Sequence, residues 1–264
     1  MTKLHSVQFH LPLQSRNHIP HASYCLVFLI FFICKVYNIG MSKFFIPANS
    51  PEDWKQLLAD PDKQWKTGYS AKSLAYCWQK TNDFPRSIKS VFRNSGIHLF
   101  QDIELLIAFP EWKVPLPGGR RASQNDIFIL AKGSNQLISI MVEGKMRESF
   151  GEIVSEWKSD KSKGKPTRLN YLCDLLRLRN DQVDHIRYQL LHRTASAVIE
   201  AKRFNAQNAL MLVHSFSKEN EQESEGFQDY CQFLSLFRLK GRINSLTRPT
   251  NIGGIRLYFG WVSE

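Results

Sequence analysis

Three polar side chains stand at the ends of two predicted strands. Asp126 begins the apolar stretch Asp-Ile-Phe-Ile-Leu-Ala, and Glu143 and Lys145 end a second apolar stretch. The Lys-Gly-Ser-Asn segment between the stretches predicts a β-hairpin. With the turn centred near residue 134, antiparallel pairing places Asp126 opposite roughly residues 141–143. Alternate side chains of a strand share a face, so Glu143 and Lys145 point the same way. We therefore expect Asp126, Glu143 and Lys145 to converge at the open end of the hairpin.

Two carboxylates and an ammonium group close together suit metal-assisted cleavage of a phosphodiester bond. The oxygens bind a hard cation such as Mg²⁺ (or Mn²⁺), which lowers the pKa of a bound water and polarises the phosphate. The lysine offsets the negative charge that develops on the phosphate. A simpler interpretation is that Asp126, Glu143 and Lys145 are ordinary polar residues near turns, since an exposed Glu–Lys pair contributes little stability. The sequence leaves both interpretations open.

The same residues resemble the motif of the PD-(D/E)XK nuclease superfamily, in which an Asp starts one strand and Glu-x-Lys lies on its neighbour. Asp126 and Glu143-Gly-Lys145 match that motif residue by residue. The resemblance implies that Asp126 and Glu143 ligate the metal. It also implies that Lys145 positions the attacking water or stabilises the pentavalent phosphate, and that Gln189 orients the groups beside them.

Two positions depart from the superfamily pattern. Asn125, rather than Pro, precedes the Asp, and the Gln-x-x-x-Tyr of some branches appears only as Gln189-x-x-x-Arg193. Gln189, His192 and Arg193 are therefore expected to face the site, His192 and Arg193 as contacts to nucleic acid. Residues 115–143 and 189–197 also resemble a family of bacterial proteins, and this second resemblance implies no activity.

The resemblance implies an α/β fold of the restriction-endonuclease type, a mixed β-sheet flanked by helices, with its core at about residues 100–216. Hydrophobic periodicity and capping signals predict a helical N-terminal part, followed by a mixture of strands and helices. His214 falls on a predicted strand and is interpreted as a core histidine. The predicted helices are 50–59, 70–78, 85–93, 171–178, 184–204 and 227–237, and the predicted strands are 105–109, 126–131, 137–145, 209–216 and 255–261.

Basic residues outside the motif offer further contacts to phosphate. Gly118-Gly119-Arg120-Arg121 combines backbone N–H groups with two guanidinium groups just before the proposed acid. Its alternative is a basic turn without a ligand. The lysine-rich stretch 158–165 fits a solvated loop better than a contact to a nucleic-acid backbone.

The whole chain is basic. Among 264 residues, 35 Lys and Arg stand against 24 Asp and Glu, a formal net charge of +11. Residues 1–40 hold three of the basic residues and no acidic one, so the rest of the chain keeps a charge of +8. Such an excess supports a nucleic-acid partner, although a basic surface also serves solubility.

Residues 1–40 differ in composition from the rest. They include an apolar run at 25–34 that is too short to span a bilayer and has no clear signal-peptide cleavage site. Anchoring or export remains the alternative to a start codon assigned upstream of the true one. We expect residues 1–40 to be non-structural, residues 41–264 to form a single domain, and no stable membrane association.

Two classes of function fit these observations. The leading hypothesis is Mg²⁺-dependent hydrolysis of phosphodiester bonds in DNA, and the alternative is a non-catalytic module on the same fold that binds nucleic acid or protein. The 5 cysteines are scattered, with no Cys-x-x-Cys pair, which fits a reducing cytoplasm and indicates neither a disulfide framework nor a structural zinc site.

Overall fold

The computed structural model describes residues 48–146, 149–160, 162–217 and 220–264. The expectation for residues 1–40 lies outside these ranges. Chain contacts group residues 42–264 into one compact unit. No helix within the described ranges is both long and apolar enough to cross a membrane.

A mixed seven-stranded sheet lies at the centre of this unit, as expected for an α/β protein. The first three strands are antiparallel neighbours, the next long strand runs parallel to the third, and the last long strand runs parallel to that one. Two short strands pair with the last. The strands are β1 (Glu104–Val114), β2 (Ser123–Gly133), β3 (Gln136–Lys145), β4 (Asn208–Ser215), β5 (Ser245–Leu246), β6 (Thr250–Ile252) and β7 (Ile255–Ser263).

The predicted hairpin is formed by β2 and β3, and its faces are as the alternation indicates. Ile127 pairs with Val142, and both side chains belong to the core beneath the N-terminal helices. Met141 belongs to the core on the other face, where Ser139 donates to the carbonyl of Ala197. One face of β3 is therefore apolar throughout, and the other ends in Glu143 and Lys145.

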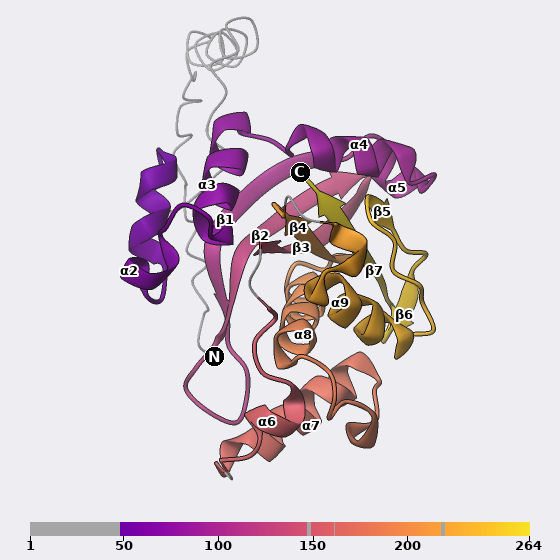
Figure 1. Cartoon of the computed structure of the whole chain (residues 1–264). Coiled ribbons are helices and arrows are strands. Elements are labelled where there is room, and N and C mark those ends of the chain that lie inside the picture. Colours follow the sequence, from indigo (N-terminus) through magenta and orange to yellow (C-terminus); the bar gives the residue numbers. More distant parts are fainter. Residues whose placement is uncertain (1–47, 147–148, 161, 218–219) are drawn as a thin grey trace, which may run out of the picture. The chain divides into compact units, whose positions relative to one another are not determined.

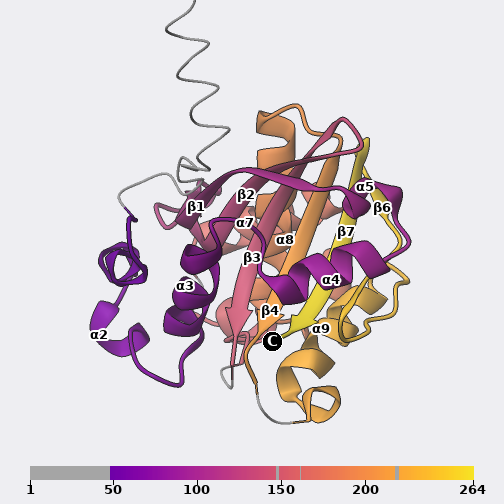
Figure 2. The same cartoon turned by 90° about the horizontal axis from the view of Figure 1, so that it is seen from above.

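The N-terminal part is helical, as predicted, and its helices cover one face of the sheet (Figures 1 and 2). Its core includes Trp78, Phe92 and Phe100, all fully buried. Burial of each such ring contributes about 1.5–3 kcal/mol. The elements are η1 (Pro51–Leu57), α2 (Pro61–Gln64), α3 (Ser70–Thr81), α4 (Arg86–Asn94) and α5 (His98–Gln101).

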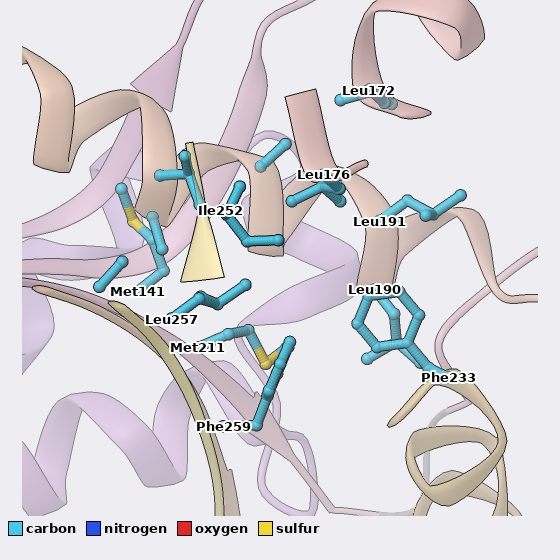
Figure 3. Packing of buried hydrophobic residues seen from close by; sticks show 14 of the residues in the cluster. Met141, Leu172, Leu176, Leu190, Leu191, Met211, Phe233, Ile252, Leu257 and Phe259 are labelled. Carbon is cyan, nitrogen blue, oxygen red and sulfur yellow. The ribbon is translucent and has the colours of Figure 1, made fainter. Parts of the chain in front are cut away.

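The opposite face is covered mainly by one long helix, with further helices around it (Figure 1). Figure 3 shows Leu190 and Leu191 of that helix packed among Leu176, Met211 and Phe233. The same helix connects β3 to β4, which run parallel. The elements are α6 (Val154–Trp157), α7 (Gly164–Leu176), η2 (Asn180–Gln182), α8 (Tyr188–Arg203), η3 (Glu221–Glu223) and α9 (Glu225–Ser235).

Several element boundaries differ from the prediction, among them the start of α7, which lies at Gly164 and not at residue 171. Two of the differences have clear physical reasons. Strand β1 continues through Pro110 to Val114, because β1 is an edge strand and an edge tolerates a residue without an N–H donor. Helix α8 begins at Tyr188 and not near residue 184, because a β-bridge between Ile153 and Arg187 keeps the preceding backbone extended.

His214 is a core histidine, as predicted. It is fully buried on β4, where its Nδ1 accepts from Trp78 Nε1 at 3.0 Å and its Nε2 lies 2.9 Å from Glu264 Oε2.

Candidate active site

Three carboxylates lie in one row across adjacent strands. In the register of the sheet, Pro110 pairs with Ile127 and Ile127 with Val142. One step along, the row is made by Glu111 of β1, Asp126 of β2 and Glu143 of β3, and all three side chains line one cavity. The structure thus places Asp126 and Glu143 together at the open end of the hairpin and adds Glu111.

Glu111 was absent from the residues expected in the site. Its φ of 52° lies in the left-handed region, which non-glycine residues seldom adopt inside a strand. Such backbone strain is found disproportionately at functional sites. In the sequence, Glu111 is visible only as an acidic residue directly after Pro110. Placing it beside Asp126 requires the knowledge that β1 continues past this proline.

Glu143 is held by three side chains. Its Oε1 accepts from Gln189 Nε2 at 2.6 Å and lies 3.2 Å from Lys145 Nζ. Its Oε2 accepts from Arg193 Nε at 2.5 Å. Gln189 and Arg193 lie one helical turn apart on α8, so both face β3. Two of the three α8 residues that were expected to face the site, Gln189 and Arg193, therefore fix the position of the Glu143 carboxylate.

Lys145 is equally constrained. Its Nζ donates to Gln189 Oε1 at 2.9 Å and to the carbonyl of Ser149 at 3.3 Å. The ammonium group also lies 4.5 Å from the centre of the Phe150 ring, within cation–π range. Only 7% of the side chain is exposed. These contacts hold the positive charge of Lys145 in a fixed position beside Glu143.

Asp126 is bound by the backbone of the motif itself. Its Oδ2 accepts from Gly144 N at 2.7 Å, while its Oδ1 lies 3.9 Å from Arg193 Nη2. A Cβ on Gly144 would lie 3.3 Å from this Oδ2 and 3.4 Å from Leu74 of α3, tighter than ordinary contact. The small residue between Glu143 and Lys145 lets the aspartate and α3 approach the strand closely.

The negative charge of the row is not fully neutralised. Burial, with the charge of Asp126 beside it, raises the pKa of Glu111 from 4.5 to about 8. Burial, with the charge of Glu143, raises the pKa of Asp126 from 3.8 to about 7. Lys145 and Arg193 supply two positive charges against three carboxylates. Ionisation of all three carboxylates therefore leaves one excess negative charge in a largely desolvated place.

A comparison with families of known sequences identifies the family to which the chain belongs. The family model of a domain of unknown function, DUF6946, matches residues 47–264. The chain belongs to the DUF6946 family. Comparisons with curated proteins and with solved structures gave no match. The matched region of the DUF6946 domain contains every residue of the site.

The cavity beside the carboxylates of the DUF6946 domain has a volume of about 480 Å³. His192 lines it, and its Nδ1 lies 2.7 Å from Ser123 Oγ. Burial and the adjacent Arg193 lower the pKa of His192 well below its ordinary value, so the imidazole is neutral. Ala59, Tyr69, Trp157 and Tyr188 also line the cavity, with neighbours from the same segments.

Arg120 and Arg121 are exposed and do not line this cavity. Gly118 serves packing, because a Cβ there would lie 2.1 Å from the carbonyl oxygen of Gly164. Arg168 of α7 donates from Nε to the Pro117 carbonyl at 2.9 Å. The Gly-Gly segment is thus bound to α7, and any phosphate contact there falls to the two exposed guanidinium groups.

A second group of ligand-type side chains has a structural explanation. Within the described ranges, one group of three side chains has all its ligand atoms within 4.8 Å of one another: Cys77, His214 and Glu264. The ligand atoms of the three carboxylates lie farther apart than this limit. Trp78 Nε1 donates only, so His214 Nδ1 must accept and Nε2 must carry the proton. A protonated Nε2 donates to Glu264 and has no lone pair for a metal.

Proposed function

We propose that the DUF6946 domain is a Mg²⁺-dependent nuclease that hydrolyses phosphodiester bonds in DNA, with a site of the PD-(D/E)XK kind. The observation that carries this proposal is the row of Glu111, Asp126 and Glu143 on adjacent strands, with Lys145 beside Glu143. The order of elements supports it, since the connection from the Glu-x-Lys strand β3 ends in the long helix α8, which is followed by the buried β4, in line with the resemblance. A restriction-endonuclease-like core is part of the same proposal.

A divalent cation fits the donor set. Mg²⁺ prefers carboxylate oxygens. Burial, and then the neighbouring carboxylates, raise the pKa values of Glu111 and Asp126, and a bound cation would favour their ionised forms. Asp126 and Glu143 would hold it, with Glu111 beside them. When bound, Mg²⁺ (or Mn²⁺) would supply Lewis-acid polarisation of the phosphate and a more acidic water.

The chain's own residues have separable roles in this proposal. Arg193 and Gln189 fix the Glu143 carboxylate, which otherwise would turn away from Asp126 in response to their mutual repulsion. Lys145, held at 2.9 Å from Gln189 Oε1, keeps a positive charge where negative charge develops on the phosphate. Gln189 is thus a positioning residue for both groups.

A cleavage assay tests the proposed reaction. Linear, circular and single-stranded DNA are incubated with the purified chain and Mg²⁺ or Mn²⁺, with EDTA as the blank. We expect metal-dependent cleavage that Glu143→Gln and Lys145→Met each slow by about 100-fold or more, since each change removes a group acting on the developing charge. Glu104→Gln and Lys132→Met are matched controls, because both residues are exposed on β1 and β2.

Two results would remove the proposal. Cleavage that persists at full rate in both Glu143→Gln and Lys145→Met would show that another site, or a contaminant, is responsible. DNA binding without cleavage in either metal would instead favour the non-catalytic module that the sequence left open.

A further inference from the structure

The reacting groups of the DUF6946 domain are recessed. The exposed fractions of the side chains are 4% for Glu143, 7% for Lys145, 9% for Arg193 and 19% for Asp126. Besides the carboxylates, the cavity is lined by residues of the segment from Leu58 to Ala71, by residues from Ser149 to Glu152, and by residues of α6 and α8. The phosphates of a duplex lie on the outside of a wide, stiff cylinder, so a recess of about 480 Å³ admits a single strand far more readily.

One wall of the cavity is a ladder of aromatic rings. Trp157 of α6 stacks on Tyr188 of α8 with 3.9 Å between ring centres and 9° between ring planes. Tyr188 in turn lies 4.9 Å from His192, which lies one residue before Arg193. The ladder runs from Trp157 through Tyr188 to His192, beside the buried arginine that holds Glu143.

A further tyrosine, from a different segment, also lines the cavity. Tyr69 immediately precedes α3, lines the cavity, and is 46% exposed, the one large hydrophobic side chain in the exposed class among the described residues. An exposed ring beside a recessed phosphate-cleaving site suits an unpaired base, because every base has a π-face and aromatic side chains stack on it without regard to sequence.

We infer that the DUF6946 domain takes its DNA substrate as a single strand, with an unpaired base stacked on Tyr69 and the strand lying along the His192–Tyr188–Trp157 wall. The inference rests on the proposed function in one respect, that the bound strand is then cleaved. Binding of the strand itself requires neither a cation nor cleavage. Free single strands and frayed ends of duplexes present the same chemistry, and an oligonucleotide without secondary structure serves as the probe.

Fluorescence anisotropy in EDTA tests the binding apart from the reaction. The full-length chain is titrated into a labelled oligothymidine and, separately, into a labelled hairpin of the same charge whose bases are all paired and whose two arms are joined by a linker without bases. We expect tighter binding to the oligothymidine. Tyr69→Ala should weaken that binding about 5- to 150-fold, since stacking of one base contributes about 1–3 kcal/mol, and Tyr69→Phe should restore it. Binding of the hairpin should change little in either variant.

Each outcome decides the inference independently of cleavage. Equal or tighter binding of the hairpin, no binding of the oligothymidine, or an unchanged affinity in Tyr69→Ala would overturn it. If the oligothymidine binds through Tyr69 but no metal supports cleavage, the nuclease proposal fails and this inference stands. Duplex cleavage without any preference for single strands leaves the nuclease proposal in place and contradicts the inference.

Discussion

Glu111 combines an unfavourable electrostatic environment with an unusual backbone conformation. It combines a raised pKa of about 8 with a left-handed φ of 52°, and its Oε2 accepts from Gln124 Nε2 at 2.7 Å. A carboxylate that is both desolvated and strained destabilises the folded chain when no cation is present. This loss of folding stability is explained if a carboxylate is needed at position 111 to bind a cation.

Replacing Glu111 by Gln should therefore change how stability depends on pH. From pH 4.5 to about 8 the folded chain keeps a proton on Glu111 that the unfolded chain has released. The free energy of unfolding falls as pH rises through this window, and above it the full penalty remains. In EDTA, Glu111→Gln should be more stable than the parent chain by about 1–3 kcal/mol at pH about 9 and nearly equal at pH about 4. Denaturant titrations at both pH values measure this, and a gain independent of pH would contradict it.

The loop between β1 and β2 shows how elements, rather than single side chains, set the geometry. Its backbone carbonyls at Leu116, Pro117 and Gly119 accept from the buried Arg168. Helix α7 thus fixes the chain directly before β2, the strand that carries Asp126.

Two glycines of similar conformation, Gly118 in this loop and Gly68 between α2 and α3, allow the effect of packing to be measured apart from that of backbone conformation. Gly118 has a φ of +80°, and an added Cβ would lie 2.1 Å from Gly164 O, whereas Gly68 has a φ of +93° and open space around it. Gly68→Ala should cost about 1–2 kcal/mol from the left-handed backbone alone. Gly118→Ala should cost about 2 kcal/mol more, because α7 must move away. Equal melting temperatures for the two variants would refute the packing argument.

The hairpin was predictable from sequence because alternation and turn chemistry are local. They placed Asp126 opposite Glu143 and put Glu143 and Lys145 on the face of Met141, which the structure shows. Glu111 was not predictable in the same way, since the extension of β1 past Pro110 depends on β1 being an edge strand. The exposure of Tyr69 was not predictable either, because the sequence does not show which of several aromatic rings remains exposed.

Across the chain, the site depends on contacts between segments far apart in sequence. Strands β1 to β3 supply the carboxylates, α8 supplies their partners, and residues of the segment from Leu58 to Ala71 line part of the cavity. The basic excess of the chain is likewise spread, with Arg120 and Arg121 exposed outside the cavity. Attraction of DNA is therefore expected to be a property of the whole surface, separate from the chemistry of the recess.

Salt dependence of DNA binding measures this surface contribution. If Arg120 and Arg121 contact phosphates, log affinity should fall linearly with log salt, and Arg120→Gln or Arg121→Gln should each shallow the slope by about 0.7 for a single strand. Arg179→Gln is the matched control, because Arg179 is exposed but paired with Asp181. Anisotropy titrations over a salt series give the slopes, and slopes identical in all variants would exclude these two arginines.

The presence of a cation among the carboxylates is most directly measured by calorimetric titration of Mn²⁺ into the EDTA-treated, dialysed chain. We predict that the chain binds Mn²⁺, that Asp126→Asn weakens binding by about tenfold or more, and that Glu104→Gln does not. Cys77→Ala should also leave binding unchanged, because the protonated Nε2 of His214 leaves that second group without a histidine ligand. Absence of Mn²⁺ binding, or equal affinity in the parent chain and Asp126→Asn, would contradict a metal-dependent site at Glu111, Asp126 and Glu143.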